Sequence, residues 1–295
     1  MDDKKINDLL LEYLTKTSKE IKKKTLKGEG RKIMGEVINR PEDLEIEIDQ
    51  VGEKVLENLL KKYKIRAVVF SEGGKIIKSS DEPDFYGALD PFDGSVLYLK
   101  GFEHNWYSAL SFYDKERKPI VSGVVDILND NFYLAQRNKN YFLEIKKNKR
   151  KKVFPQKINK PKDSLVLASY LMSSRYSSKL IDFFGDFIKS LPPKALLYPQ
   201  GGPFIYTYLA KGLVDAYLMF DEPRSEIDPG FPFAKFAGSQ IISVKPNGSY
   251  QDYEFIPGKQ NEKVELLIAT SNPKLRDQLI KHYVKEYEKR RAFRP

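Results

Sequence analysis

The chain has 295 residues, and its 51 basic and 41 acidic side chains give a formal net charge of +10. It contains no cysteine, which excludes a disulfide framework and a thiol nucleophile and leaves only His104 and His282 to join carboxylates at a zinc site. No stretch approaches the roughly 20 apolar residues of a membrane span, and the first residues lead into no signal-peptide core. We therefore expect a cytoplasmic protein with no membrane partner.

The excess of positive charge is spread along the chain in short runs such as Lys22-Lys23-Lys24. Such runs usually form solvated faces. A basic protein can attract nucleic acid, but it can equally steer a phosphorylated small molecule to a site. Charge alone leaves both partners open; the motifs below favour the small phosphorylated metabolite, and nucleic acid is then not expected to be the main partner. Many Lys and Glu residues without cysteine are also typical of a thermophile.

The spacing of apolar residues predicts both helices and strands in the first half of the chain. Apolar residues at helical spacing predict helices over residues 5–24 and from Asp49 to about residue 60, on either side of a basic loop around Gly28. Apolar runs bounded by turn residues predict strands. These strands cover residues 67–70, 85–89, 106–113, 120–127 and 131–135.

The second half alternates strands with helices. The basic, proline-containing segment 148–162 is the best junction, so we expect an N-terminal α+β subdomain over 1–150 and a C-terminal α/β subdomain over 151–295. Strands are expected over 165–169, 196–198, 214–220, 240–243 and 266–269, and helices over 178–191, 204–211, 231–237 and from Pro273 onward. Halves of these types pack naturally as a layered sandwich.

Residues 90–95 read Asp-Pro-Phe-Asp-Gly-Ser and follow a predicted buried strand. We expect Asp90 and Asp93 in the turn at the end of that strand, where open α/β structures form ligand sites. Paired carboxylates suit a hard cation such as Mg²⁺. The same residues are typical of a type I turn, so this stretch alone leaves both interpretations open.

Other acids also stand at the ends of predicted core elements. Asp49 starts a helix, Glu72 ends a strand, and Asp228 follows a strand in the second half. A single acid at such a place is usually a solvated loop residue. Several together would gather unpaired negative charge, which a bound cation would neutralise.

These motifs, in this order, resemble the inositol monophosphatase family of Mg²⁺-dependent, lithium-sensitive phosphatases. Asp90 to Ser95 match the family's D-P-[IL]-D-G-[ST] signature, and Ser71-Glu72-Gly73 partly matches its G-E-E motif. Weaker matches are Asp49 with Glu53, Gly123 to Asp126, Phe132 to Ala135, Gly201-Gly202, Ala210 to Tyr217, Ile227-Asp228 and Phe236 to Gly238. The resemblance implies an αβαβα sandwich of the sugar phosphatase type, and a homodimer.

The resemblance also implies residue roles. Glu72, Asp90, Asp93, Asp228 and the backbone carbonyl of Phe92 would bind two or three Mg²⁺ ions. Asp49 and Ser95, with Glu72, would orient and deprotonate a water for in-line attack on phosphorus. Gly94, Ser95 and Asp228 would contact the substrate, the first two through backbone N–H groups at a helix start.

Two departures from the family pattern stand out. Gly73 replaces the second Glu of G-E-E, so a carboxylate that tunes the metal site is absent from that position. Ile227 replaces the tryptophan before Asp228, and Pro229-Gly230-Phe231-Pro232 follows it. Because Pro232 lacks an N–H, we expect the next helix to start near Phe231. If Asp228 is not a metal ligand, Asp221 or Glu226 would take its place.

The resemblance favours a Mg²⁺-dependent phosphomonoesterase acting on a small phosphorylated polyol or sugar, such as inositol monophosphate or fructose 1,6-bisphosphate. A nucleotide such as 3′-phosphoadenosine 5′-phosphate is the alternative substrate if Phe204, Tyr206 or Tyr208 lines the pocket. A second alternative is a catalytically weakened member that binds RNA or a protein partner.

Overall fold

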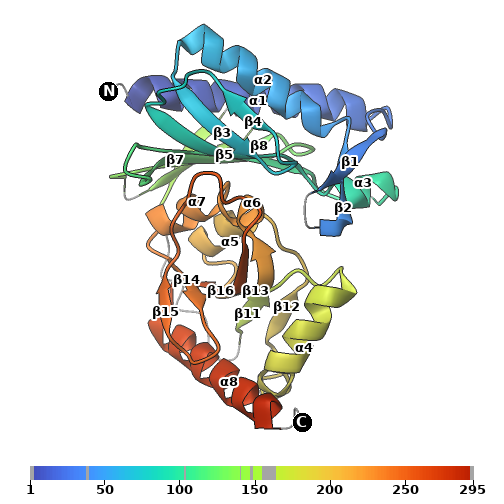
Figure 1. Cartoon of the computed structure of the whole chain (residues 1–295), viewed down its shortest axis with the longest axis vertical. Coiled ribbons are helices and arrows are strands. Elements are labelled where there is room, and N and C mark those ends of the chain that lie inside the picture. The colour runs from blue at the N-terminus through green and yellow to red at the C-terminus, as the bar shows by residue number, and fades with distance from the viewer. Residues whose placement is uncertain are drawn as a thin grey trace.

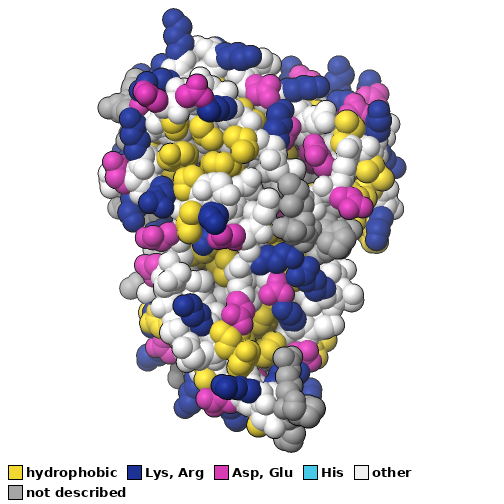
Figure 2. Space-filling view, viewed as in Figure 1, with side chains coloured by type: hydrophobic (Ala, Val, Ile, Leu, Met, Phe, Trp, Pro, Cys, Tyr) yellow, Lys and Arg dark blue, Asp and Glu magenta, His cyan; other side chains and the backbone are white. Residues whose placement is uncertain are grey.

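The computed structural model describes residues 3–37, 40–102, 104–139, 141–146, 149–154 and 164–292. Within these ranges no helix is both long and apolar enough to cross a membrane. Figure 2 shows one face of the molecule, on which Lys and Arg side chains are interspersed with Asp and Glu. Ion pairs such as Lys22 with Asp130 contribute to this mixed surface.

The first two layers are a pair of helices and a large sheet (Figure 1). Helices α1 (Asp3–Thr25) and α2 (Asp49–Tyr63) pack against an eight-stranded sheet of order β10-β9-β8-β7-β6-β5-β3-β4. Its strands are β3 (Ala67–Ser71), β4 (Ile76–Lys78), β5 (Phe85–Asp93), β6 (Tyr107–Tyr113), β7 (Pro119–Asp126), β8 (Asn131–Gln136), β9 (Phe142–Lys146) and β10 (Lys149–Val153). A separate hairpin, β1 (Ile33–Val37) and β2 (Arg40–Ile46), and the short helix α3 (Ser95–Leu99) lie at one end.

A second sheet has six strands in the order β12-β11-β13-β16-β14-β15. They are β11 (Val166–Ala168), β12 (Leu196–Tyr198), β13 (Ala216–Pro223), β14 (Gln240–Val244), β15 (Tyr250–Asp252) and β16 (Lys263–Thr270). Short helices α5 (Ile205–Ala210), α6 (Arg224–Ile227) and α7 (Phe231–Phe236) lie between the two sheets, and α4 (Ser174–Lys189) and α8 (Pro273–Ala292) cover the far face (Figure 1). The expected αβαβα sandwich is therefore confirmed.

Three buried apolar cores hold these layers together. Leu10 and Leu56 join α1 and α2 to the first sheet, and Phe184 with Leu279 joins α4 and α8 to the second. The central core joins both sheets through the middle helices, with Phe231 among its members. Burial of such side chains is the main favourable term, at about 25 cal/mol per Å² of apolar area.

Local signals predicted several boundaries. Helix α2 begins at Asp49, and α7 begins at Phe231 with a proline in its first turn. The side chain of Asn272 caps α8 because its Oδ1 accepts hydrogen bonds from the N–H groups of Lys274 (3.1 Å) and Leu275 (3.2 Å).

The expected junction between the two subdomains lies only partly within the described residues. The stretch 149–153 pairs with β9 as an edge strand of the first sheet, so that sheet extends three residues past the expected boundary at 150. The second sheet begins at Val166. Residues 147, 148 and 155–163 lie outside the described part of the chain.

The placement of Asp90 and Asp93 in a turn was wrong. Strand β5 runs through both residues, and its pairing with β6 is interrupted between them, where Pro91 and Phe92 have no partner in the register. Proline has no N–H to donate to the sheet, which explains the break. As a result Asp90 is fully buried, whereas Asp93 is partly exposed.

Asp228 lies in the central core. Its carboxylate accepts a hydrogen bond from the hydroxyl of Tyr253 at 2.7 Å, and its backbone oxygen accepts one from Tyr113. Burial raises the pKa of Asp228 from 3.8 to about 7, although the Tyr253 hydrogen bond and the charge of Arg224 act in the opposite direction.

We expect Asp228→Asn to stabilise the protein at neutral pH. Between pH 4 and 7 the folded state binds a proton at Asp228 that the unfolded state has lost, so its contribution to stability falls as the pH rises through this window. The asparagine keeps an acceptor for Tyr253 and carries no charge. Its advantage in unfolding free energy over the wild type should therefore grow between pH 5 and pH 8, by on the order of a few kcal/mol.

Urea unfolding of both proteins at the two pH values measures this difference. The exposed Asp252→Asn serves as the control, with no such growth expected. An equal difference at both pH values would contradict the assignment.

Candidate functional site

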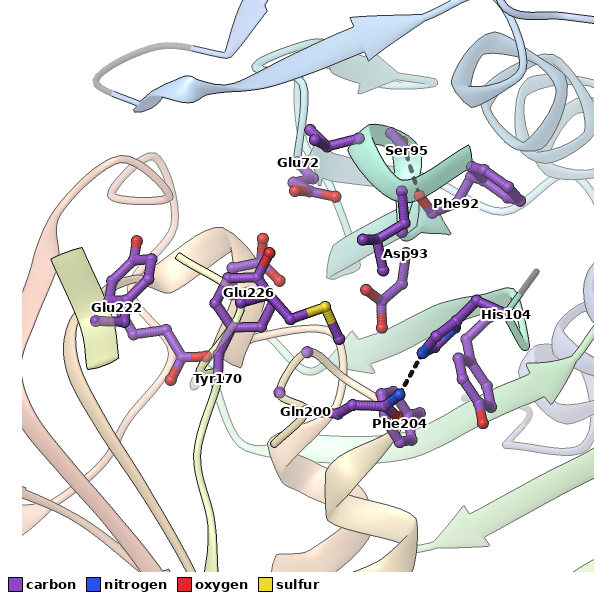
Figure 3. A pocket seen from close by; sticks show the side chains of 18 of the residues that line it. Glu72, Phe92, Asp93, Ser95, His104, Tyr170, Gln200, Phe204, Glu222 and Glu226 are labelled. Atoms are coloured by element: carbon purple, nitrogen blue, oxygen red, sulfur yellow. Dashed lines mark hydrogen bonds between the residues drawn. The ribbon is translucent and has the colours of Figure 1, made fainter. Parts of the chain in front are cut away.

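A pocket of about 100 Å³ lies between the two halves of the chain. Glu72, Asp93 and Ser95 line it from the first half, and Glu222 and Glu226 line it from the second (Figure 3). The pocket therefore carries several carboxylates that are far apart in the sequence.

Asp90 does not line this pocket, but the charges of Asp93 and Glu226, which do, act on it. It is completely buried, and among the described residues neither carboxylate oxygen has a hydrogen-bond donor. Burial and the negative charges of Asp93, Glu226 and Asp49 hold its pKa well above the usual value. Glu72 is close enough to bond to Asp90, but only if one of the two carboxyls carries a proton.

The donor set fits a hard cation in its chemistry. A buried carboxylate with no donor, next to further carboxylates, requires either protons or a positive ion. Oxygen ligands of this type are those that Mg²⁺ prefers. Among the described residues, however, no group of three or more His, Asp or Glu side chains could hold a metal ion as it stands. The charge and ligand types therefore fit the ion, while the side chains do not yet enclose it.

Ser95 and Asp49 meet at one edge of the pocket, as expected. The hydroxyl of Ser95, at the start of α3, lies 2.9 Å from Oδ1 of Asp49 and 3.0 Å from the carbonyl oxygen of Phe92, so its single proton has two acceptors. The N–H of Ile46 donates to Oδ2 of Asp49 at 2.6 Å. Asp49 is thereby held in place as an acceptor that orients Ser95.

Two glycines let the backbone come close to these groups. Gly94 has φ +109°, and a Cβ there would come within 2.9 Å of the ring of Trp106. Gly202 has φ +92°, and its Cβ would come within 2.9 Å of Cγ of Asp93. Larger residues would be strained at both positions and would displace Trp106 or Asp93.

The structure places Glu226, and not Asp228, at the pocket. Asp228 points into the central core toward Tyr253, one helical turn after Arg224, whose carbonyl accepts the N–H of Asp228 at 2.8 Å. The other substitute, Asp221, pairs with Lys179 and with Arg175 at 3.5 Å, and it does not line the pocket. Glu226, in the short helix α6, therefore lines the pocket and its charge acts on Asp90, whereas the metal-binding role of Asp228 stays a prediction.

Of the three aromatic residues considered for stacking a base, Phe204 alone lines the pocket. Its ring is stacked on Tyr107 with the centroids 4.1 Å apart, so that face is covered. No motif in the sequence pointed to Tyr170 or to the hydrogen-bonded pair of His104 and Gln200, which also line the pocket (Figure 3).

Comparisons with known proteins agree with this geometry. No family model matches the chain. A fructose-1,6-bisphosphatase/inositol-1-monophosphatase of Thermococcus kodakarensis is 29% identical over 134 residues, which is 45% of this chain and half of that protein. The Nus factor SuhB of Pseudomonas aeruginosa is 21% identical over 235 residues, covering 79% of this chain and 84% of that protein.

Solved structures share the fold at low identity. A crystal structure of an inositol monophosphatase–fructose 1,6-bisphosphatase superposes with a TM-score of 0.69 at 18% identity, over 94% of this chain and 98% of that one. This likeness shows that the chain has the fold of these inositol monophosphatases, and the two curated relatives are in line with the resemblance of its ordered motifs to that family.

Proposed function

We propose that this protein is a Mg²⁺-dependent phosphomonoesterase that hydrolyses a small phosphorylated polyol or sugar. The single observation that carries the proposal is Asp90, a fully buried carboxylate without a donor beside the acids of the pocket. The name of the Thermococcus relative supports the same reaction class and includes both inositol monophosphate and fructose 1,6-bisphosphate as substrates to test.

Glu72, Asp90, Asp93 and Glu226 would hold two or three Mg²⁺ ions, together with the Phe92 carbonyl. When bound, Mg²⁺ lowers the pKa of water and stabilises charge on phosphate oxygens. Asp49 keeps the Ser95 hydroxyl in place through their 2.9 Å contact, so that Ser95 can orient a water and Asp49 can receive its proton. Positioning and charge account for most of the catalysis of phosphoryl transfer, and no covalent intermediate is needed.

A second candidate is a member with weak turnover that binds RNA or a protein partner. The relative from Pseudomonas aeruginosa, a Nus factor, supports it. The departure at Gly73 and the absence of a closed ligand set among the described residues point the same way. A homodimer and a cytoplasmic location stay predictions under either candidate.

We expect phosphate release from at least one ester in a panel tested with and without Mg²⁺. The panel contains inositol monophosphate, fructose 1,6-bisphosphate and 3′-phosphoadenosine 5′-phosphate. Release should stop when EDTA removes the ion and return when Mg²⁺ is added. No release from any ester, together with RNA binding that weakens with salt, would favour the second candidate instead.

We expect Asp93→Asn to lower phosphate release by at least about 100-fold, because it removes a carboxylate that faces the pocket. Without Mg²⁺ the variant should be at least as stable as the wild type, since Asp93 is a negative charge that disfavours ionised Asp90. Thermal unfolding and a phosphate assay test both expectations. Asp186→Asn, on the exposed side of α4, is the control. Full activity of Asp93→Asn would show that the site is wrongly assigned.

We also expect Glu226→Gln and Asp228→Asn to differ. Glu226 lines the pocket and its charge acts on Asp90, so its loss should lower activity by about tenfold to 100-fold or more. Asp228→Asn keeps the Tyr253 contact and should change activity far less. The reverse order of effects would mean that Asp228 turns toward the pocket in the active enzyme.

A further inference from the structure

A second, smaller cavity adjoins the pocket at Glu72. It shares Glu72 and Ser95 with the pocket, and it is also lined by Glu45, Asp49 and Gly73. The group of acids at the site therefore continues past Glu72 to strand β2, which carries Glu45.

The carboxylate of Glu45 lies against the backbone of Gly73. A Cβ built on Gly73 would lie 3.3 Å from both Cδ and Oε2 of Glu45. The carboxylate of Glu45 thus lies where a side chain at position 73 would begin. The missing side chain leaves room beside Glu72 that an acid from a different strand occupies.

The charges around Glu45 are mostly negative. Asp49, Glu53 and Glu72 line the same cavity. Lys75 pairs with Glu53 at 3.2 Å and with Glu57 at 2.8 Å, and its side chain is 41% exposed. Burial and the charge of Glu53 raise the pKa of Glu45, while Gln50 and Lys75 act in the opposite direction.

Asp90 connects this group to the pocket. Among the described residues its two oxygens have no hydrogen-bond donor, the negative charge of Asp49 raises its pKa, and Glu72 is close enough to bond to it. The acids of the pocket and of the smaller cavity are therefore linked through Asp90, and a bound cation would lower their excess of negative charge.

We propose that Glu45 is part of the cation site and supplies from β2 the carboxylate that position 73 lacks. This inference rests on the proposed function, because it assumes that the pocket binds a divalent ion. Glu45 acts as a positioning residue: it adds negative charge and hydrogen-bond acceptors beside Glu72 and Asp49.

The test measures binding of Mn²⁺, whose free ion gives an electron paramagnetic resonance signal, together with phosphate release. Glu45→Gln keeps the shape of the side chain and should weaken Mn²⁺ binding by about tenfold to 100-fold. Glu47→Gln is the matched control, because Glu47 pairs with Lys24 at 3.3 Å and does not line the cavity. Circular dichroism checks that each variant is folded.

A relocation experiment makes the test sharper. Gly73→Glu alone should lower the melting temperature, because its side chain would crowd Glu45. The double variant Glu45→Ala, Gly73→Glu moves the carboxylate to the other strand and should bind Mn²⁺ more tightly than Glu45→Ala alone. The double variant Glu45→Ala, Gly73→Gln fills the same space without the charge, so recovery with glutamate but not with glutamine separates charge from packing.

The outcomes separate the two proposals. If the wild type binds Mn²⁺ and Glu45→Gln binds it equally well, Glu45 only fills space and the inference is overturned while the proposed function stands. If Glu45→Ala loses Mn²⁺ binding and the double variant does not regain any, a carboxylate at position 73 cannot replace Glu45 and the inference is overturned. If the wild type neither binds Mn²⁺ nor releases phosphate, the proposed function itself fails.

Discussion

The burial of Asp90 without a donor is the constraint on which the site depends. A carboxylate in the interior is costly unless a proton, a donor or a cation compensates it. The neighbours of Asp90 are other acids, so the folded chain keeps an electrostatic cost at the meeting point of its two halves. Three large apolar cores provide the stability that tolerates this cost. Such local destabilisation is typical of a functional site.

The layered architecture explains how the acids come together. Asp90 and Asp93 stand where β5 loses its regular pairing with β6, so one acid stays buried and the other reaches the pocket. Glu226 approaches from the short helix α6 between the sheets. The acids of the pocket therefore come from both halves of the chain, and their distances depend on how the two sheets pack.

The comparison of Asp228 with Glu226 shows how finely the site depends on packing. The two acids are two residues apart, and both follow β13. The hydroxyl of Tyr253 donates to the carboxylate of Asp228 and the hydroxyl of Tyr113 to its backbone oxygen, whereas Glu226 lines the pocket and its charge acts on Asp90. Two aromatic side chains from distant parts of the chain thus hold Asp228 in the core. Packing also decides the place of Glu45, because a Cβ at Gly73 would lie only 3.3 Å from its carboxylate.

The sequence by itself determined most elements, the layered fold class and the stretch from Asp90 to Ser95, because periodicity, caps and turn residues act over a few neighbouring positions. The sequence motifs also predicted that Asp49 and Ser95 act together on a water, and the structure joins these two side chains by a hydrogen bond. Only the tertiary structure decided that Glu226 lines the pocket in place of Asp228 and that Glu45 lies over Gly73. Those choices depend on contacts between residues far apart in the chain, and no local pattern records which of several acids such contacts will turn inward.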